Sequence, residues 1–305
     1  MRSKLPLTTE NLAKIACLYS GITFGVYWIP LRALGEAGFT GSWAVLLFNL
    51  SALCIVSPVL FVRWRYFITG RFRFHMCAIF CGLAFALYAG AFMYTEVVRV
   101  LIMFYLMPIW GFLLGRVVIG EKITPIRWGS MAFGLAGLFV ICGSNSGLVI
   151  PNNPGDWMAL AAGVLWAAGS MMLLTNRDDT VNYTIGFLFW ATVGSILMAM
   201  LATDFGLMTA PNWAGLGDVL YWLVPLAVLL IIPSALATIY GATKLNPGVV
   251  GLFFMTEISV GTVTAAIFAG EPFGLREITG VVLVTLAGVA ETLYQIYRKM
   301  VAIRR

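Results

Sequence analysis

Glu257 is the residue whose type and position point most directly to chemistry. It lies in an apolar stretch, residues 247–269, ten residues after Pro247. A helix rises about 1.5 Å per residue, so this carboxyl group would lie near the middle of a membrane-spanning helix. Ionisable side chains at that depth cost several kcal/mol and face the protein interior, a cavity or a partner. We therefore expect Glu257 to bind a substrate ammonium group or to carry a coupling proton. A protonated carboxyl that only hydrogen-bonds between helices is the alternative.

Tyrosine and tryptophan side chains at mid-depth could line a substrate cavity near such a carboxyl group. They offer an apolar face to a substrate side chain and an O–H or N–H group that orients it. The candidates are Tyr27, Trp28, Tyr88, Tyr105 and Trp166. Aromatic packing in the core is the alternative for each, and we expect about half of them to contact the cavity.

Three other polar residues have narrower expected roles. Asn49 lies at mid-depth in an apolar segment and must hydrogen-bond either a substrate or a neighbouring helix. Glu121 and Glu271 each follow a glycine at the end of an apolar segment, where we expect them to set the turn between helices.

The chain offers little for metal or cofactor chemistry. It contains one histidine and five cysteines, and all five cysteines lie in apolar segments. This distribution is typical of packed cysteines rather than of a disulfide framework or a metal site, and no cofactor is expected. The G-x-x-x-x-G-K-[ST] motif of ATP-driven pumps is absent from the sequence. Without a histidine base or a carboxylate pair at mid-depth, a membrane-embedded enzyme is disfavoured.

The composition predicts an all-α integral membrane protein. The chain has 305 residues, of which 61% are hydrophobic and 10% charged, too little polar surface for an ordinary soluble domain. Apolar segments of roughly 17–25 residues, the length that crosses a bilayer as a helix, number ten. We expect transmembrane helices over residues 11–30, 42–62, 74–94, 97–117, 126–143, 156–175, 183–203, 219–240, 247–269 and 276–297.

The net charge of +6 is explained by membrane topology. If the N-terminus is cytoplasmic and ten helices alternate, sixteen basic residues lie on the cytoplasmic side. The opposite side holds only Arg32, Arg99 and Arg276. This asymmetry follows the positive-inside rule and predicts that both termini are cytoplasmic. It leaves no reason to expect a nucleic-acid partner.

Two passages about 150 residues apart resemble each other. Residues 106–140 contain Gly120-Glu121, and residues 256–289 contain Gly270-Glu271 in the same context. Each half holds five expected helices, an odd number, so the two copies must cross the membrane in opposite directions. We predict two inverted five-helix repeats, residues 1–148 and 149–305, which form one compact unit with a central cavity.

Small residues and prolines mark expected crossings and bends. In lipid, helices associate closely where small residues face each other. The expected crossing residues are Gly21, Gly25, Gly111, Gly115 and Gly261. Proline removes a backbone hydrogen bond, so Pro108 and Pro233 are expected to be flexing points.

The passage Pro108-Ile109-Trp110-Gly111-Phe112-Leu113-Leu114-Gly115, followed by Gly120-Glu121 and Gly134-Leu135-Ala136-Gly137, resembles the EamA-type signature of the drug/metabolite transporter superfamily. Within this superfamily the chain is most similar to the bacterial YddG-type amino acid exporters. The resemblance implies a multi-pass inner-membrane carrier that exports aromatic and other neutral amino acids by alternating access. Members often have a proline in the ninth helix where this chain has Glu257-Ile258-Ser259, so a kink there is not assured.

A secondary transporter embedded in the lipid bilayer is therefore the expected function, with amino acids as substrates and protons as a candidate coupling ion. An exporter of lipophilic cations or other metabolites with the same fold is the main alternative. A channel is disfavoured because channels usually close a pore by subunit symmetry. Since one chain carries both repeats, we expect a functional monomer.

Overall fold

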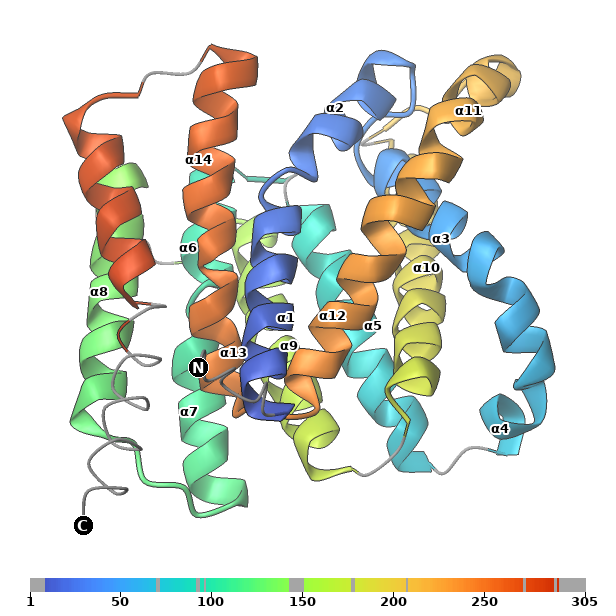
Figure 1. Ribbon diagram of the computed structural model, residues 1–305. Coiled ribbons are helices and arrows are strands. Elements are labelled where there is room, and N and C mark those ends of the chain that lie inside the picture. Colours follow the sequence, from blue (N-terminus) through green and yellow to red (C-terminus); the bar gives the residue numbers. More distant parts are fainter. Residues whose placement is uncertain are drawn as a thin grey trace, which may run out of the picture.

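The computed structural model describes residues 9–69, 72–91, 94–95, 97–142, 151–176, 179–206, 208–270, 273–287 and 290. Throughout these ranges the regular structure is helical, and strands are absent from them (Figure 1). Eight helical segments are long and apolar enough to cross a membrane. The chain is thus an all-helical protein with the properties of an integral membrane protein, as the composition predicted.

The helices follow one another with short connections. In chain order they are α1 (Thr9–Phe24), α2 (Trp28–Glu36), α3 (Ser42–Val62), α4 (Trp64–Thr69), α5 (Phe72–Ala91), α6 (Val97–Phe104), α7 (Met107–Val118), α8 (Pro125–Cys142), α9 (Pro154–Thr175), α10 (Thr180–Asp204), α11 (Leu216–Leu226), α12 (Ile232–Ala242), α13 (Pro247–Phe254) and α14 (Thr256–Ala269).

Two of the ten expected spans fall short of membrane-crossing length in the described residues. The apolar part of α8, Pro125–Ile141, has fewer than 18 residues. The expected span 276–297 is described over 275–287 and at 290, where it is helical, and its remainder lies outside the described residues. The described structure therefore supports eight spans and leaves the count of ten as an expectation.

Three spans that the sequence predicted as continuous helices are interrupted near their middles. The first divides between α1 and α2, the fourth at 105–106 between α6 and α7, and the ninth at Met255 between α13 and α14. Pro108 lies in the first turn of α7, where a missing N–H and a fixed φ are tolerated. The break in the fourth span thus lies directly before the proline that we expected to bend it.

The ninth span breaks although it has no proline at the corresponding position. Two side-chain hydroxyl groups compensate the carbonyl groups that lose their helical partners at the break. Thr256 donates to the Phe253 carbonyl oxygen at 2.7 Å, and Tyr105 donates to the Phe254 carbonyl oxygen at 3.1 Å. Met255 stands 150 residues after Tyr105, the same separation as between Gly111 and Gly261.

The second expected flexing point also coincides with irregular helix. A π-helical turn, η3 (Ala227–Ile231), separates α11 from α12, and Pro233 follows it in the first turn of α12. Because proline cannot donate a backbone hydrogen bond, a widened turn before it accommodates the lost bond.

Glycines allow α1 to pack closely along both halves of the ninth span. A Cβ atom on Gly25 would lie 2.8 Å from the Glu257 carbonyl oxygen, and one on Gly261 would lie 3.7 Å from the Gly25 carbonyl oxygen. Gly21 faces Thr256 in the same interface. Figure 1 shows α1 running beside α13 and α14, which stand one above the other.

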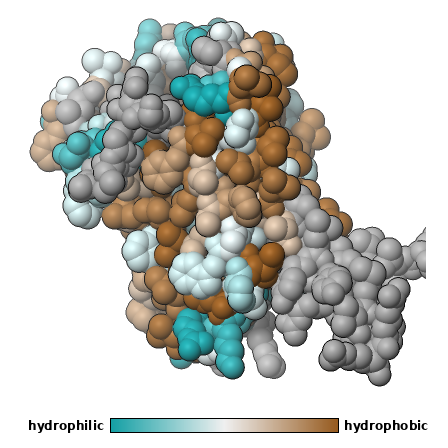
Figure 2. Space-filling view, turned by 90° about the vertical axis from the view of Figure 1, so that its left-hand side faces the viewer, coloured by the Kyte–Doolittle hydropathy of each residue, from teal (hydrophilic) through white to brown (hydrophobic). Residues whose placement is uncertain are grey.

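A further close contact joins α8 to residues 275–287. A Cβ atom on Gly280 would lie 2.7 Å from the Gly137 carbonyl oxygen. These segments form one lateral face of the molecule, on which side chains such as Phe133 and Val282 are about half exposed. Figure 2 shows apolar residues across the middle of this face and hydrophilic residues toward its upper and lower ends. This pattern is that of a surface in contact with lipid.

Basic side chains divide unequally between the two ends of the helix bundle. The connections and helix ends at the lower end of Figure 1 carry most of them, and we call this the basic end. Its described members are Lys14, Arg63, Arg65, Arg73, Arg116, Lys122, Arg127 and Lys244. Arg32, Arg99 and Arg276 belong to the opposite end. The described residues are thus divided between the two ends in the way that the charge pattern predicted.

Candidate functional site

Glu257 lies in the first turn of α14, directly after the break in the ninth span, and is half-buried. The Tyr88 hydroxyl group on α5 donates to its Oε1 atom at 3.1 Å. The Tyr105 hydroxyl group, at the break in the fourth span, donates to its Oε2 atom. Residues from three spans therefore meet at this carboxyl group, and all three were expected site residues.

The Tyr105 hydroxyl group has one hydrogen atom but two acceptors within reach, Glu257 Oε2 and the Phe254 carbonyl oxygen. When Glu257 is ionised, the hydrogen atom can bond the carboxylate. When Glu257 is protonated, the carboxyl group can donate to Tyr105, and Tyr105 can then donate to Phe254. The arrangement thus accommodates both protonation states without moving a backbone atom.

Five aromatic rings from five helices form a closed circuit beside this carboxyl group. Phe24 on α1 lies 6.4 Å from Phe85 on α5, measured between ring centroids. Phe187 on α10 follows at 5.8 Å from Phe85, and Trp166 on α9 at 6.3 Å from Phe187. Phe254 on α13 closes the circuit at 5.7 Å from both Trp166 and Phe24. Phe254 precedes Glu257 by one helical turn, so apolar ring faces adjoin the carboxyl group.

Of this aromatic circuit, the sequence singled out only Trp166. The four phenylalanines have no polar group that would distinguish them from the other 17 of the 21 in the chain. Their positions one turn from expected site residues, such as Phe24 before Tyr27 and Phe85 before Tyr88, are a usable signal only when the facing helices are known.

The remaining expected residues lie at different distances from Glu257. Tyr27 is buried and packs edge-on against Phe24 of the circuit, with ring centroids 5.1 Å apart. Trp28 Nε1 donates to Thr264 Oγ1 at 3.0 Å and joins α2 to α14, two turns beyond Glu257. Asn49 is 2% exposed and donates to Ser195 Oγ at 3.1 Å. Its amide thus forms a hydrogen bond between α3 and α10 and lies outside the cluster around Glu257.

On the side of Glu257 toward the basic end, α7 packs tightly against α13. A Cβ atom on Gly111 would lie 2.7 Å from the Pro247 carbonyl carbon, and one on Gly115 would lie 2.5 Å from Asn246 Nδ2. Asn246 caps α13 and also donates to Glu121 Oε2, and Arg127 bonds Glu121 Oε1 at 2.6 Å. Glu121 therefore does more than set a turn, because it joins α7 and α8 to the start of the ninth span.

The two halves of the ninth span differ in their surroundings. Every residue of α13 is buried. In α14, by contrast, residues 260–266 are all half-buried. Helix α6 packs mainly against α9 and α8, and in the described residues no close packing of α6 on α14 matches that of α7 on α13. The site is therefore closed by helix packing toward the basic end and less enclosed toward the opposite end.

That opposite end holds an ion pair outside the site. Asp156 is completely buried at the start of α9 and bonds Arg99 on α6, and its Oδ1 atom also accepts from Thr95 Oγ1 at 3.0 Å. Breaking such a pair leaves an uncompensated buried charge. Asp156 and Arg99 thus fasten the fourth span to the sixth.

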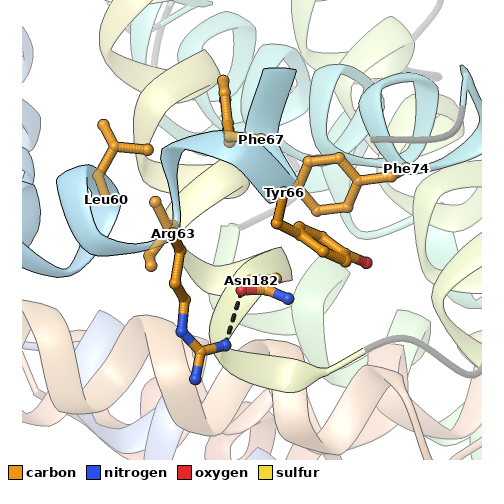
Figure 3. A pocket seen from close by; sticks show the side chains of 7 residues that line it. Leu60, Arg63, Tyr66, Phe67, Phe74 and Asn182 are labelled. Carbon is orange, nitrogen blue, oxygen red and sulfur yellow. Dashed lines mark hydrogen bonds between the residues drawn. The ribbon is translucent and has the colours of Figure 1, made fainter. Parts of the chain in front are cut away.

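A small pocket lies at the basic end (Figure 3). It is lined by Leu60, Arg63, Tyr66, Phe67, Phe74, Asn182 and Ile185. Arg63 donates to Asn182 Oδ1 at 2.8 Å and forms an ion pair with Asp179 at 2.5 Å. The hydrogen bond from Arg63 holds the pKa of Asp179 below its ordinary value of 3.8. The guanidinium charge is thus compensated within the protein, and its contacts join the end of α3 to the start of α10.

Substituting Asp179 by asparagine is expected to lower the stability of the folded protein by less than about 1 kcal/mol, because both partners are partly exposed. A carboxyl group whose pKa is lower in the folded state than in the unfolded state stabilises the fold at pH values above its ordinary pKa. This contribution is lost as the pH falls through the lowered pKa. Thermal melting in detergent should therefore show a small deficit of Asp179→Asn at neutral pH, and this deficit should disappear as the pH falls through the lowered pKa of Asp179. A deficit that persists there would contradict the assignment.

In the described residues, no three His, Cys, Asp or Glu side chains lie close enough together to hold a metal ion. The site is instead a single carboxyl group, two tyrosine hydroxyl groups and a set of aromatic rings. Such a set can bind a cation or exchange a proton, but it provides no nucleophile with a paired base.

Comparisons with known proteins concern the family and the fold. Residues 11–143 match the EamA-like transporter family, over less than half of the chain. One solved crystal structure has a TM-score of 0.69 and 15% sequence identity, and the match covers 92% of this chain and 96% of that one. At this identity the likeness concerns the fold. The search of curated proteins gave no match. This part of the chain is therefore similar to a family of transporters.

Proposed function

We propose that this protein is a secondary transporter that exports small solutes bearing an amino group, with aromatic and other neutral amino acids as the expected substrates. The observation that carries this proposal is the position of Glu257. Its carboxyl group lies about midway along the candidate span Pro247–Phe268, at a break in the helix, and accepts hydrogen bonds from tyrosines of two other spans. Carboxyl groups at such depth in transporters mark the substrate or ion pathway.

The basic end is assigned to the cytoplasm by the positive-inside rule, which also places both termini there. In this orientation the α7–α13 packing closes the cytoplasmic side. The half-buried α14 faces the route to the outside. This is one of the two states that alternating access requires.

The inverted repeats 1–148 and 149–305 supply the second state. The breaks at Tyr105 and Met255 occupy corresponding positions in the two repeats, which supports the symmetry. If each repeat adopted the conformation that the other has now, α7 would separate from α13 and α6 would approach α14. This change would expose Glu257 to the cytoplasm.

Within this scheme the substrate ammonium group binds Glu257 and its side chain lies against the aromatic circuit. Because Tyr105 can donate either to Glu257 or to the Phe254 carbonyl oxygen, Glu257 can take up a proton when no substrate is bound. Protons therefore remain a candidate coupling ion. Export of lipophilic cations is the second candidate function, and the aromatic circuit beside one carboxyl group favours it specifically. Both functions need only one copy of the chain.

The test is uptake of radiolabelled phenylalanine and threonine into proteoliposomes that contain the purified protein. Saturable uptake above that of empty liposomes is expected for both amino acids. Uptake of a labelled lipophilic cation with no amino acid flux would replace the first candidate by the second. No flux of either kind would contradict the transport proposal.

A further inference from the structure

We infer that the site selects its substrate by an ammonium group and an aromatic or apolar group, and that it does not require a substrate carboxylate. This inference rests on the proposed transport function and narrows its substrate class. Amines and amides derived from aromatic amino acids should then be accepted at least as well as the amino acids themselves.

The first argument is the distribution of positive charge. The segments that supply the site, residues 15–31, 74–98, 100–115, 155–176 and 245–275, contain neither lysine nor arginine. A substrate carboxylate bound there would approach Glu257 without a compensating cation, and burying an uncompensated charge is costly.

The nearest basic side chains are already paired. Lys14, on α1, forms an ion pair with Glu10 at 2.8 Å. Ten residues separate it from Phe24, a rise of about 15 Å along a helix. Arg99, on α6, bonds Asp156 with two guanidinium nitrogen atoms. Neither could reach a substrate without breaking a buried ion pair.

The second argument is the use of hydrogen-bond donors. The hydroxyl groups of Tyr88 and Tyr105 both point to the Glu257 carboxyl group. Both hydroxyl groups thus stabilise the carboxylate of Glu257 itself. A carboxylate held in this way is suited to binding a substrate cation. A substrate carboxylate would have to compete with Glu257 for the same two donors.

The third argument is which rings of the aromatic circuit remain accessible. Phe187, Trp166 and Phe254 are at most 5% exposed, whereas Phe24 and Phe85 are half-buried. The accessible pair lies on α1 and α5. Gly25, directly after α1, lies against the Glu257 carbonyl oxygen, and Tyr88 of α5 donates to the Glu257 carboxyl group. We therefore assign Phe24 and Phe85 as the residues that contact the substrate ring and determine the preference for aromatic substrates.

The test is inhibition of labelled phenylalanine uptake in proteoliposomes by phenylalaninamide, phenethylamine and 3-phenylpropionate, with direct uptake of labelled phenethylamine alongside. The amide and the amine should inhibit at concentrations equal to or below that of phenylalanine itself. The acid, which lacks the amino group, should require a concentration at least about tenfold higher for the same inhibition.

Inhibition by phenylalanine without inhibition by the amide and the amine would overturn the inference and leave the proposed amino acid transport intact. Saturable uptake of phenethylamine without uptake of phenylalanine would support the inference while contradicting amino acid export. Failure of both labelled compounds to be taken up would overturn both.

The assignment of Phe85 is tested by Phe85→Leu, with Phe133→Leu on the lipid-facing surface of α8 as the control. Phe85→Leu should weaken inhibition by phenethylamine more than inhibition by isopentylamine, an aliphatic amine. The control should change neither. An equal loss for both amines would show a merely structural effect and would overturn the assignment.

Discussion

Transport by the Glu257→Gln variant is expected to fall at least about 30-fold below that of the wild-type protein. Glutamine keeps the size of the side chain and can still accept from Tyr88, but it cannot compensate a substrate cation. Removing one partner of a buried, hydrogen-bonded charge pair typically costs 2–5 kcal/mol, roughly 30-fold or more in affinity. The measurement is the initial rate of substrate uptake into proteoliposomes.

The matched control is Glu36→Gln. Glu36 ends α2, is exposed, and forms a loose ion pair with Arg32. This variant loses the same charge without touching the site and should transport at a rate close to wild type. Equal rates for Glu257→Gln and wild-type protein would show that Glu257 only bonds neighbouring helices.

Gly111→Leu is expected to give the second largest effect, a loss of transport of about tenfold or more, because it prevents closure of the site toward the basic end. A Cβ atom at this position would overlap the backbone at Pro247 and Gly248, which cannot move aside as a flexible side chain would. The closed packing of α7 on α13 should therefore be lost, and with it the state that is closed toward the basic end.

The opening can be measured between spin labels on cysteines substituted for Val118 and Lys244, in a background without native cysteines. Val118 ends α7, and Lys244 precedes α13. Gly111→Leu should shift the distance distribution to longer values. Gly129→Leu is the control, since a Cβ atom there would meet nothing within 4 Å. An unchanged distribution with normal transport in Gly111→Leu would contradict the closing role of this crossing.

The features that the sequence predicted well follow from solvation. Long apolar segments and the unequal distribution of basic residues depend only on which groups can leave water. These requirements act on each segment separately, so composition and spacing reveal them before any helix is placed.

The partners of these features depend on which helices face each other, and here the sequence was less informative. Tyr88 and Tyr105 were expected near a cavity, but nothing in their spacing indicated that both would bond Glu257. The break at Met255 was not foreseen, because hydroxyl groups of Thr256 and Tyr105 take the place of a proline there. Asn49 could have bonded substrate or helix, and only the position of Ser195 distinguishes the two.

Glu121 is a second residue whose contact partner the sequence did not indicate. Its place after Gly120 suggested a turn, and the residue does lie in the connection between α7 and α8. Its bond to Asn246, 125 residues away, depends on the packing of α7 against α13. Contacts between the proposed repeats are therefore the part of the site that one sequence leaves open.

The central claim is that Glu257 binds the amino group of the substrate. Its most direct test is equilibrium binding of radiolabelled substrate to the purified protein in detergent, compared between wild type, Glu257→Gln and Glu36→Gln. Saturable binding to wild type and Glu36→Gln, with loss of binding to a folded Glu257→Gln, is the predicted result. Binding of equal affinity to Glu257→Gln would contradict the claim.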